Sequence, residues 1–177
     1  MNFLETKLKG AFIIEMMRLE DERGYFARSF CQDEFQQEGL NPCVAQCNVS
    51  FNLHKGTIRG MHYQDYPYWE VKLVRCTRGM IFDVIIDLRP DSPTYLEWTG
   101  VKLSPENYRL IYIPEGFAHG FQTIEDNTEV IYQMSECYHP ECSKGVKWDD
   151  PTFDIDWPIS DVIVSEKDTN FPWWRVR

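Results

Sequence analysis

The residues whose side chains could carry out chemistry lie in two separated segments of the chain. The first holds His62 and Gln64, with Glu70 shortly afterwards, and the second runs Ile113-Pro-Glu-Gly-Phe-Ala-His119-Gly. An imidazole has an ordinary pKa of about 6.5, so it can both take and release a proton at neutral pH. The flanking Arg59-Gly60 and Gln64 favour a catalytic histidine at 62 over one that is merely packed in a core.

Together these segments resemble the two motifs of cupin barrels. The second matches P-x-G-x-x-H in full, whereas the first matches only in part. Metal-binding cupins carry a second histidine where this chain has Gln64, which leaves His62, Glu70 and His119 as a conceivable ligand set. Because an amide oxygen is a poor ligand for metals that prefer imidazole, the sequence favours a cupin without metal over a metal-dependent oxygenase.

Seven motifs, in order from residue 21 to residue 168, resemble those of the dTDP-4-dehydrorhamnose 3,5-epimerases. They are Asp21–Phe26, Ile58–Gln64, Lys72–Arg75, Ile113–Phe121, Trp148–Pro151, Asp156–Pro158 and Ser165–Asp168. The resemblance implies an isomerase without cofactor or metal that inverts a nucleotide-linked 4-keto-6-deoxyhexose at C3, C5 or both. It points first to conversion of dTDP-4-dehydro-6-deoxy-D-glucose to dTDP-4-dehydro-L-rhamnose. A 3-epimerase, a 5-epimerase, a ketoisomerase and a non-catalytic sugar-binding cupin are the alternatives.

The resemblance also implies a division of labour among four residues. Inversion through an enolate needs a base on one face of the sugar, an acid on the other and a cation near the ketone oxygen. His62 matches the base, Asp168 the carboxylate that orients it, Tyr132 the acid and Lys72 the cation. Tyr138 is the fallback proton donor or a wall of the sugar pocket.

Further positions match the family's substrate-binding residues. Arg23 and Arg59 suit the diphosphate, because guanidinium pairs with phosphate in a bidentate way. The other expected binding residues are Phe26, Gln46, Asn48, His119, Tyr138 and Lys167. The chain departs from the family pattern at Arg28, Cys47 and Ser143, where acids are usual, so these positions leave the identity of the substrate open.

The elements that must position these residues read mainly as short strands. Runs rich in Val, Ile, Phe and Tyr alternate with turn residues, which is typical of an antiparallel sandwich or barrel. The expected strands are 72–77, 80–88, 101–103, 109–113, 120–124 and 129–134. One helix is expected at 33–39, with Asp33 as N-cap and Gly39 as its end, and an irregular tail from Asp149. The predicted fold is all-β, a cupin-like jelly roll.

The whole chain supports one domain spanning residues 1–177. Its formal net charge of -10 argues against a nucleic-acid partner, since phosphate backbones attract clustered Lys and Arg. No stretch has the length of a membrane span or the pattern of a secretory signal, so a cytoplasmic location is expected. The family resemblance further implies a homodimer whose N-terminal strands cross to the neighbouring subunit and bring Arg23 towards its partner's site.

Overall fold

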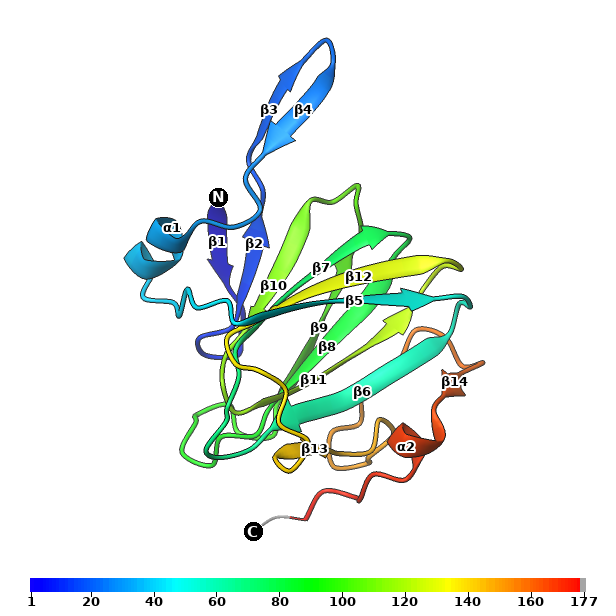
Figure 1. Cartoon of the computed structure of the whole chain (residues 1–177). Helices are drawn as coiled ribbons and strands as arrows, with labels where there is room; N and C mark the ends of the chain where they lie inside the picture. Colours follow the sequence, from blue (N-terminus) through cyan, green and yellow to red (C-terminus); the bar gives the residue numbers. More distant parts are fainter. Residues whose placement is uncertain (176–177) are drawn as a thin grey trace.

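Two antiparallel sheets face each other in the computed structural model, which describes residues 1–175 (Figure 1). The first sheet has the order β1 (Asn2–Glu5), β2 (Phe12–Glu15), β10 (Arg109–Ile113), β7 (Lys72–Arg78), β12 (Thr128–Met134) and β5 (Gln46–Asn52). The second has the order β13 (Ser143–Gly145), β6 (Thr57–Gln64), β11 (Phe117–Thr123), β8 (Ile81–Asp87) and β9 (Trp98–Leu103), and β14 (Ile163–Val164) pairs with β6 in parallel. This arrangement confirms the predicted all-β, cupin-like jelly roll.

The core lies between the two sheets and takes side chains from both. Val74 of β7, Ile111 of β10 and Val130 of β12 come from the first sheet, and Ile85 and Phe121 from the second. All five are almost completely buried. Alternate residues of a strand point to opposite faces, so the inward positions that do not fill this core are available for polar side chains.

The six predicted strands are confirmed, with ends that differ by at most three residues from the expected ones. The predicted helix is confirmed as α1 (Gln32–Gln37), but its N-cap is Cys31, without a side-chain hydrogen bond, and Asp33 lies inside the first turn. Gly39 does end it, with a φ of 73° that an L side chain rarely adopts. The expectation of an irregular tail was wrong in part, because the tail contains β14 and α2 (Glu166–Thr169). Ser165 caps α2 by accepting a hydrogen bond from the Asp168 amide.

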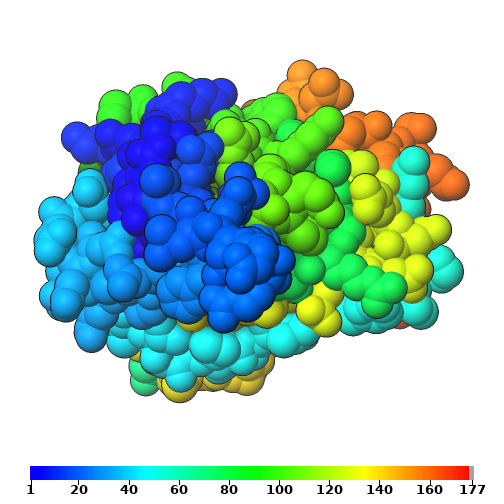
Figure 2. All heavy atoms as spheres, turned by 90° about the horizontal axis from the view of Figure 1, so that it is seen from above, coloured from blue at the N-terminus to red at the C-terminus, as the bar shows by residue number. Residues whose placement is uncertain are grey.

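A hairpin of β3 (Arg18–Asp21) and β4 (Gly24–Ala27) stands away from the two sheets (Figure 1). In the view from above it projects towards the reader (Figure 2). Leu19 and Phe26 on this hairpin are 71% and 70% exposed. Large apolar side chains on a projecting arm are typical of a segment that packs against another molecule.

Within residues 1–175, no helix is long and apolar enough to cross a membrane.

Candidate active site

The pairing of β6 with β11 places two histidines opposite each other. His62 and His119 are register partners on these neighbouring strands, so their side chains share one face of the sheet. The strands approach closely beside them: a Cβ on Gly60 would lie 2.5 Å from the Gly120 Cα. Glycine is therefore required at 60, where φ is also positive at 146°.

His62 is held by Asp168, although 106 residues separate the two in the chain. His62 Nε2 lies 2.8 Å from Asp168 Oδ1, and the Gly60 amide donates to Asp168 Oδ2 at 3.2 Å. Burial by itself raises the pKa of Asp168, but the hydrogen bond and charge of His62 and the bond from Gly60 outweigh it and hold the pKa below its usual value. Asp168 is thus an anion that fixes the imidazole and stabilises its charged form.

His119 has an aspartate of its own. Its Nε2 lies 2.8 Å from Oδ2 of Asp83, a fully buried residue of β8. Burial raises the pKa of the Asp83 carboxyl, and the nearby charges of His119 and Lys72 oppose this effect. The second histidine is therefore as firmly positioned as the first, from a different strand.

Lys72 opens β7 on the facing sheet and is buried, with 7% of its surface exposed. Its Nζ donates to the His62 carbonyl oxygen at 3.2 Å and pairs with Glu70 Oε1 at 3.0 Å. A buried ammonium beside the backbone of His62 is placed to stabilise negative charge that develops on a ligand next to that histidine.

Tyr132 projects from β12 on the same sheet face as Lys72. Met134 is the register partner of Lys72, and Tyr132 lies two residues earlier on that strand. The Tyr132 ring lies 6.1 Å from the His119 ring, centroid to centroid. Burial, assisted by the charge of Asp83, raises the pKa of Tyr132, so its hydroxyl stays protonated and can act as a proton donor.

Polar side chains on β5 and β6 extend the site beyond these groups. Gln46 and Asn48 share a face of β5 with a hydrogen bond of 3.2 Å, and Gln46 Oε1 accepts from the Tyr138 amide at 3.1 Å. Arg59 Nε donates to Asn52 Oδ1 at 2.7 Å. Lys167 follows on α2, next to Asp168. The expected binding residues at 46, 48, 59 and 167 therefore lie on elements that adjoin the catalytic candidates, and Tyr138 lies in the connection that follows β12.

Two expected binding residues are not brought to this site within one chain. Arg23 and Phe26 lie on the projecting β3–β4 hairpin (Figure 1). The Arg23 side chain is 83% exposed and pairs with Asp21 of the same hairpin. They can reach a substrate bound near His62 only from another copy of the chain or after a movement of the hairpin.

The groups that the cupin pattern offers as metal ligands are bonded to other protein groups. Gln64 donates from Nε2 to the carbonyls of Tyr68 and Cys137 at 3.0 and 3.1 Å, and its Oε1 accepts from the His139 amide. This buried amide therefore ties the β6–β7 and β12–β13 connections together. Among residues 1–175, no three His, Cys, Asp or Glu side chains form a group that could hold a metal ion.

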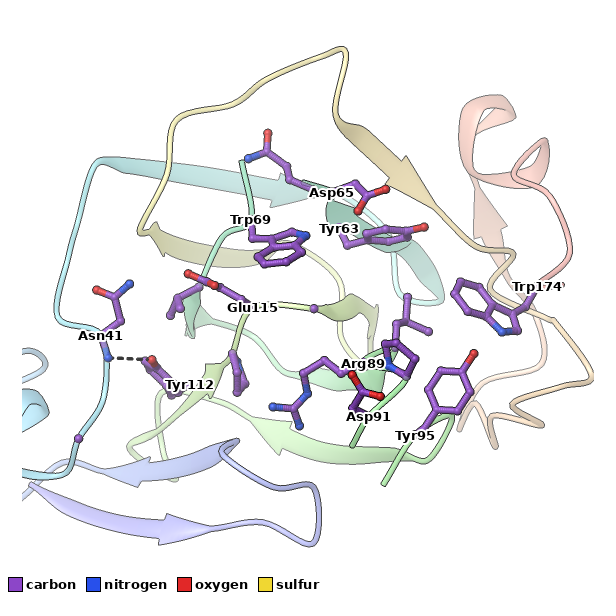
Figure 3. A pocket seen from close by; sticks show the side chains of 17 residues that line it. Asn41, Tyr63, Asp65, Trp69, Arg89, Asp91, Tyr95, Tyr112, Glu115 and Trp174 are labelled. Carbon is purple, nitrogen blue, oxygen red and sulfur yellow. Dashed lines mark hydrogen bonds between the residues drawn. The ribbon is translucent and has the colours of Figure 1, made fainter. Parts of the chain in front are cut away.

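The structure contains a pocket of about 840 Å³ (Figure 3). In the close-up, Tyr63, Asp65 and Trp69 stand along one side of it, and Arg89 and Tyr95 along the other. None of the predicted site residues lines it. The Arg89 guanidinium is already bonded to Asp87, so this pocket does not present a free cation for a diphosphate.

Three residues that contribute to the site were missed by the reasoning from sequence. Asp83 holds His119, Asn52 holds Arg59, and the Phe171 ring meets the His62 ring edge-on at 5.6 Å. An acid inside the apolar strand Ile81–Asp87 was the available signal for Asp83. Nothing in the sequence singles out Asn52 or Phe171, because each matters only through a partner that is distant in the chain.

Comparison with known proteins agrees with this geometry. A family model described as dTDP-4-dehydrorhamnose 3,5-epimerase matches residues 5–175. The chain is 50% identical over 173 residues to dTDP-4-dehydrorhamnose 3,5-epimerase of Methanothermobacter thermautotrophicus, covering 96% of this chain and 92% of the relative. It is 37% identical over 162 residues to dTDP-4-dehydrorhamnose 3-epimerase of Streptomyces niveus, covering 91% and 78%.

A solved structure gives the same result. The crystal structure of dTDP-4-dehydrorhamnose 3,5-epimerase from Bacillus anthracis, with TDP and PPi bound, superimposes with a TM-score of 0.95 at 39% identity and covers 98% of this chain and 99% of that one. On sequence and fold together, the chain belongs to the dTDP-4-dehydrorhamnose 3,5-epimerase family.

Proposed function

We propose that this protein epimerises dTDP-4-dehydro-6-deoxy-D-glucose at C3 and C5, giving dTDP-4-dehydro-L-rhamnose. One observation carries the proposal. His62, backed by Asp168, comes from one sheet, whereas Tyr132 and Lys72 come from the facing sheet. A sugar ring held between the sheets has a base on one face and a proton donor on the other, which is what inversion requires.

The chemistry follows from the tautomer of His62. Its Nε2 bonds to Asp168, so Nδ1 is the nitrogen that takes a proton from C3 or C5. The electron pair of the broken C–H bond moves into the ring to form an enolate, and its negative oxygen is stabilised by the Lys72 ammonium. Tyr132 then gives its proton to the carbon from the opposite face. Exchange with water returns a proton to Tyr132 and removes one from His62.

The remaining expected residues hold the nucleotide end of the substrate. Arg59 pairs with the diphosphate, and Gln46 and Asn48 offer amides to the nucleoside. His119 and Tyr138 contact the sugar, and Lys167 adds positive charge at the rim of the site. The support for this assignment is that these residues lie on β5, β6, β11 and α2, which adjoin the catalytic candidates, apart from Tyr138, whose amide in the β12–β13 connection is bonded to Gln46.

We further propose a homodimer of single-domain chains spanning residues 1–177, located in the cytoplasm. Each chain lends its β3–β4 hairpin to the neighbouring site and delivers Arg23 and Phe26 there. The hairpin's projection and its exposed apolar side chains support this exchange (Figure 2). Arg23 has only the local partner Asp21 among the described residues, which a phosphate could replace.

Incubation with dTDP-4-dehydro-6-deoxy-D-glucose in deuterated water tests the function. NMR should show deuterium at C3 and C5 of the sugar and the product with both centres inverted. Exchange at neither carbon would overturn the proposal.

A narrower activity is the second candidate. The relative from Streptomyces niveus is a 3-epimerase by name, and Arg28 and Ser143 stand where family members usually have acids. These positions affect how the substrate is held and leave the proton-transfer residues unchanged. The same NMR experiment separates the candidates, because a 3-epimerase would invert C3 and leave C5 unlabelled.

A further inference from the structure

We propose that Glu70 is a positioning residue that fixes the Lys72 ammonium for enolate stabilisation. The inference rests on the proposed function, because it assigns a partner to the cation of that mechanism. By the cupin pattern, Glu70 is a possible metal ligand. In the structure its carboxylate binds an ammonium: Glu70 Oε1 lies 3.0 Å from Lys72 Nζ.

The geometry leaves Lys72 with donors to spare. An ammonium has three N–H groups. One donates to the His62 carbonyl oxygen at 3.2 Å, and the nitrogen lies 3.0 Å from Glu70 Oε1 as an ion pair. The hydrogen bond and the ion pair together restrict the orientation of the ammonium, so that a remaining N–H can meet a ligand oxygen beside His62. A single bond would leave the long Lys72 side chain free to rotate.

The backbone that carries Glu70 is itself held in place. The neighbouring Val71 amide donates to Ser135 Oγ at 2.8 Å, and its carbonyl accepts from the Ser135 amide at 3.0 Å. Ser135 directly follows β12, the strand that carries Tyr132. The position of Glu70, and through it that of Lys72, is therefore tied to the strand of the proton donor.

The pair is not arranged for stability alone. Glu70 and Lys72 are 8% and 7% exposed, and taking both charges out of water costs more than a surface ion pair returns. Glu70 Oε2 is buried and has no hydrogen-bond partner within residues 1–175. Buried carboxylates with a purely structural role normally have both oxygens bonded. The buried negative charge of Glu70 is explained by its positioning of the Lys72 ammonium.

Glu70→Gln tests this role, because the side chain keeps its shape and loses its charge. We expect kcat to fall about 10-fold with KM changed less than about 2-fold, since the effect falls on a transition-state interaction. Deuterium wash-in should fall by the same factor. Glu70→Asp, which keeps the charge but shortens the side chain, should lie between wild type and Glu70→Gln.

A double-mutant cycle separates positioning from general damage. In a Lys72→Met background, Glu70→Gln should cause no further loss of kcat, because the residue through which it acts is gone. Asp65→Asn is the matched control. Asp65 lies in the same β6–β7 connection as Glu70 and pairs with Lys144 of β13. The substitution removes that ion pair without touching Lys72, so kcat should stay at the wild-type value.

The outcomes distinguish the proposed function from the proposed role of Glu70. A wild-type enzyme that neither exchanges nor inverts refutes the proposed function. An active wild type with an unchanged Glu70→Gln variant refutes the role of Glu70 alone. Equal fold-losses from Glu70→Gln with Lys72 present and absent would also refute it, as would a loss that appears only in KM.

Discussion

His62 and His119 occupy directly paired positions on β6 and β11, and each imidazole is held at 2.8 Å by an aspartate from a different part of the chain. The two are nevertheless unequal. The His62 side chain is 38% exposed and can meet a substrate, whereas His119 is 6% exposed behind Tyr132. This difference in exposure favours His62 as the base and His119 as a fixed contact for the sugar.

His62→Ala should abolish both deuterium wash-in and epimerisation, because no proton leaves the sugar without a base. Asp168→Asn keeps the shape but loses the charge that stabilises the imidazolium, so we expect a loss of roughly 10³–10⁴-fold in kcat. NMR of substrate in deuterated water measures both. Proton exchange at the wild-type rate in His62→Ala would show that the base is another residue.

Tyr132→Phe should separate deuterium wash-in from inversion. Deprotonation by His62 continues, so wash-in survives, while inversion falls by about 10²–10⁴-fold because the general acid is missing. Since burial and Asp83 raise the Tyr132 pKa above its ordinary value of about 10, the phenol does not ionise below that pH. The inversion rate of the wild type should therefore show no loss attributable to Tyr132 up to pH 10. Normal inversion by Tyr132→Phe would make Tyr138 the next candidate.

Mixing two inactive variants tests the exchanged hairpin. Arg23→Ala and His62→Ala should each be severely impaired alone, because every site lacks one of the two residues. In a mixed dimer, the Arg23→Ala chain keeps His62 and receives an intact Arg23 from its partner. Random reassociation should then restore about a quarter of the wild-type sites. If Arg23 serves its own chain, mixing restores nothing, and sedimentation at micromolar concentration shows whether a dimer exists at all.

Chelation tests the absence of a metal requirement. Activity should survive EDTA treatment, because Gln64, which replaces the second cupin histidine, is bonded to two loops, and Glu70 forms an ion pair with Lys72. The measurement is the epimerisation rate before and after dialysis against EDTA, with metal analysis of the same samples. Loss of activity that iron or zinc restores would contradict the expectation.

Asp87 should make the stability of the fold depend on acid pH. Burial by itself raises its pKa, but bonds from Arg89, Ser92 and Thr94 outweigh this and hold the pKa below 3.8. A carboxylate whose pKa is lower in the folded state contributes stability above its unfolded pKa, and this contribution is lost as pH falls through the folded value. Asp87→Asn should cost about 2–4 kcal/mol of unfolding free energy at pH 7.

The difference in unfolding free energy between wild type and Asp87→Asn should shrink as pH falls below about 3.8. Urea unfolding at pH 7 and at successive values below pH 4 measures it. An identical difference at every pH would show that the charge of Asp87 contributes nothing and that only its shape matters.

From sequence alone, six of the strands and most of the candidate residues were predicted, but β1 to β6, β13 and β14 were not. A run rich in apolar and aromatic residues between turn residues is a local property, so Arg109–Ile113 was predicted with its observed ends. The motif around His62 and the run that ends in His119 are also local, and their order along the chain was enough to indicate the family.

The sequence could not show which of these residues lie together in the folded chain. The bond between His62 and Asp168 joins positions 106 residues apart, and no local pattern specifies that α2 docks beside β6. Asp83 and Glu70 acquire their partners in the same way, from strand register and from an ion pair in the interior. Burial and partner charges, which set the pKa of Asp168 and Tyr132, arise only when the two sheets close on each other.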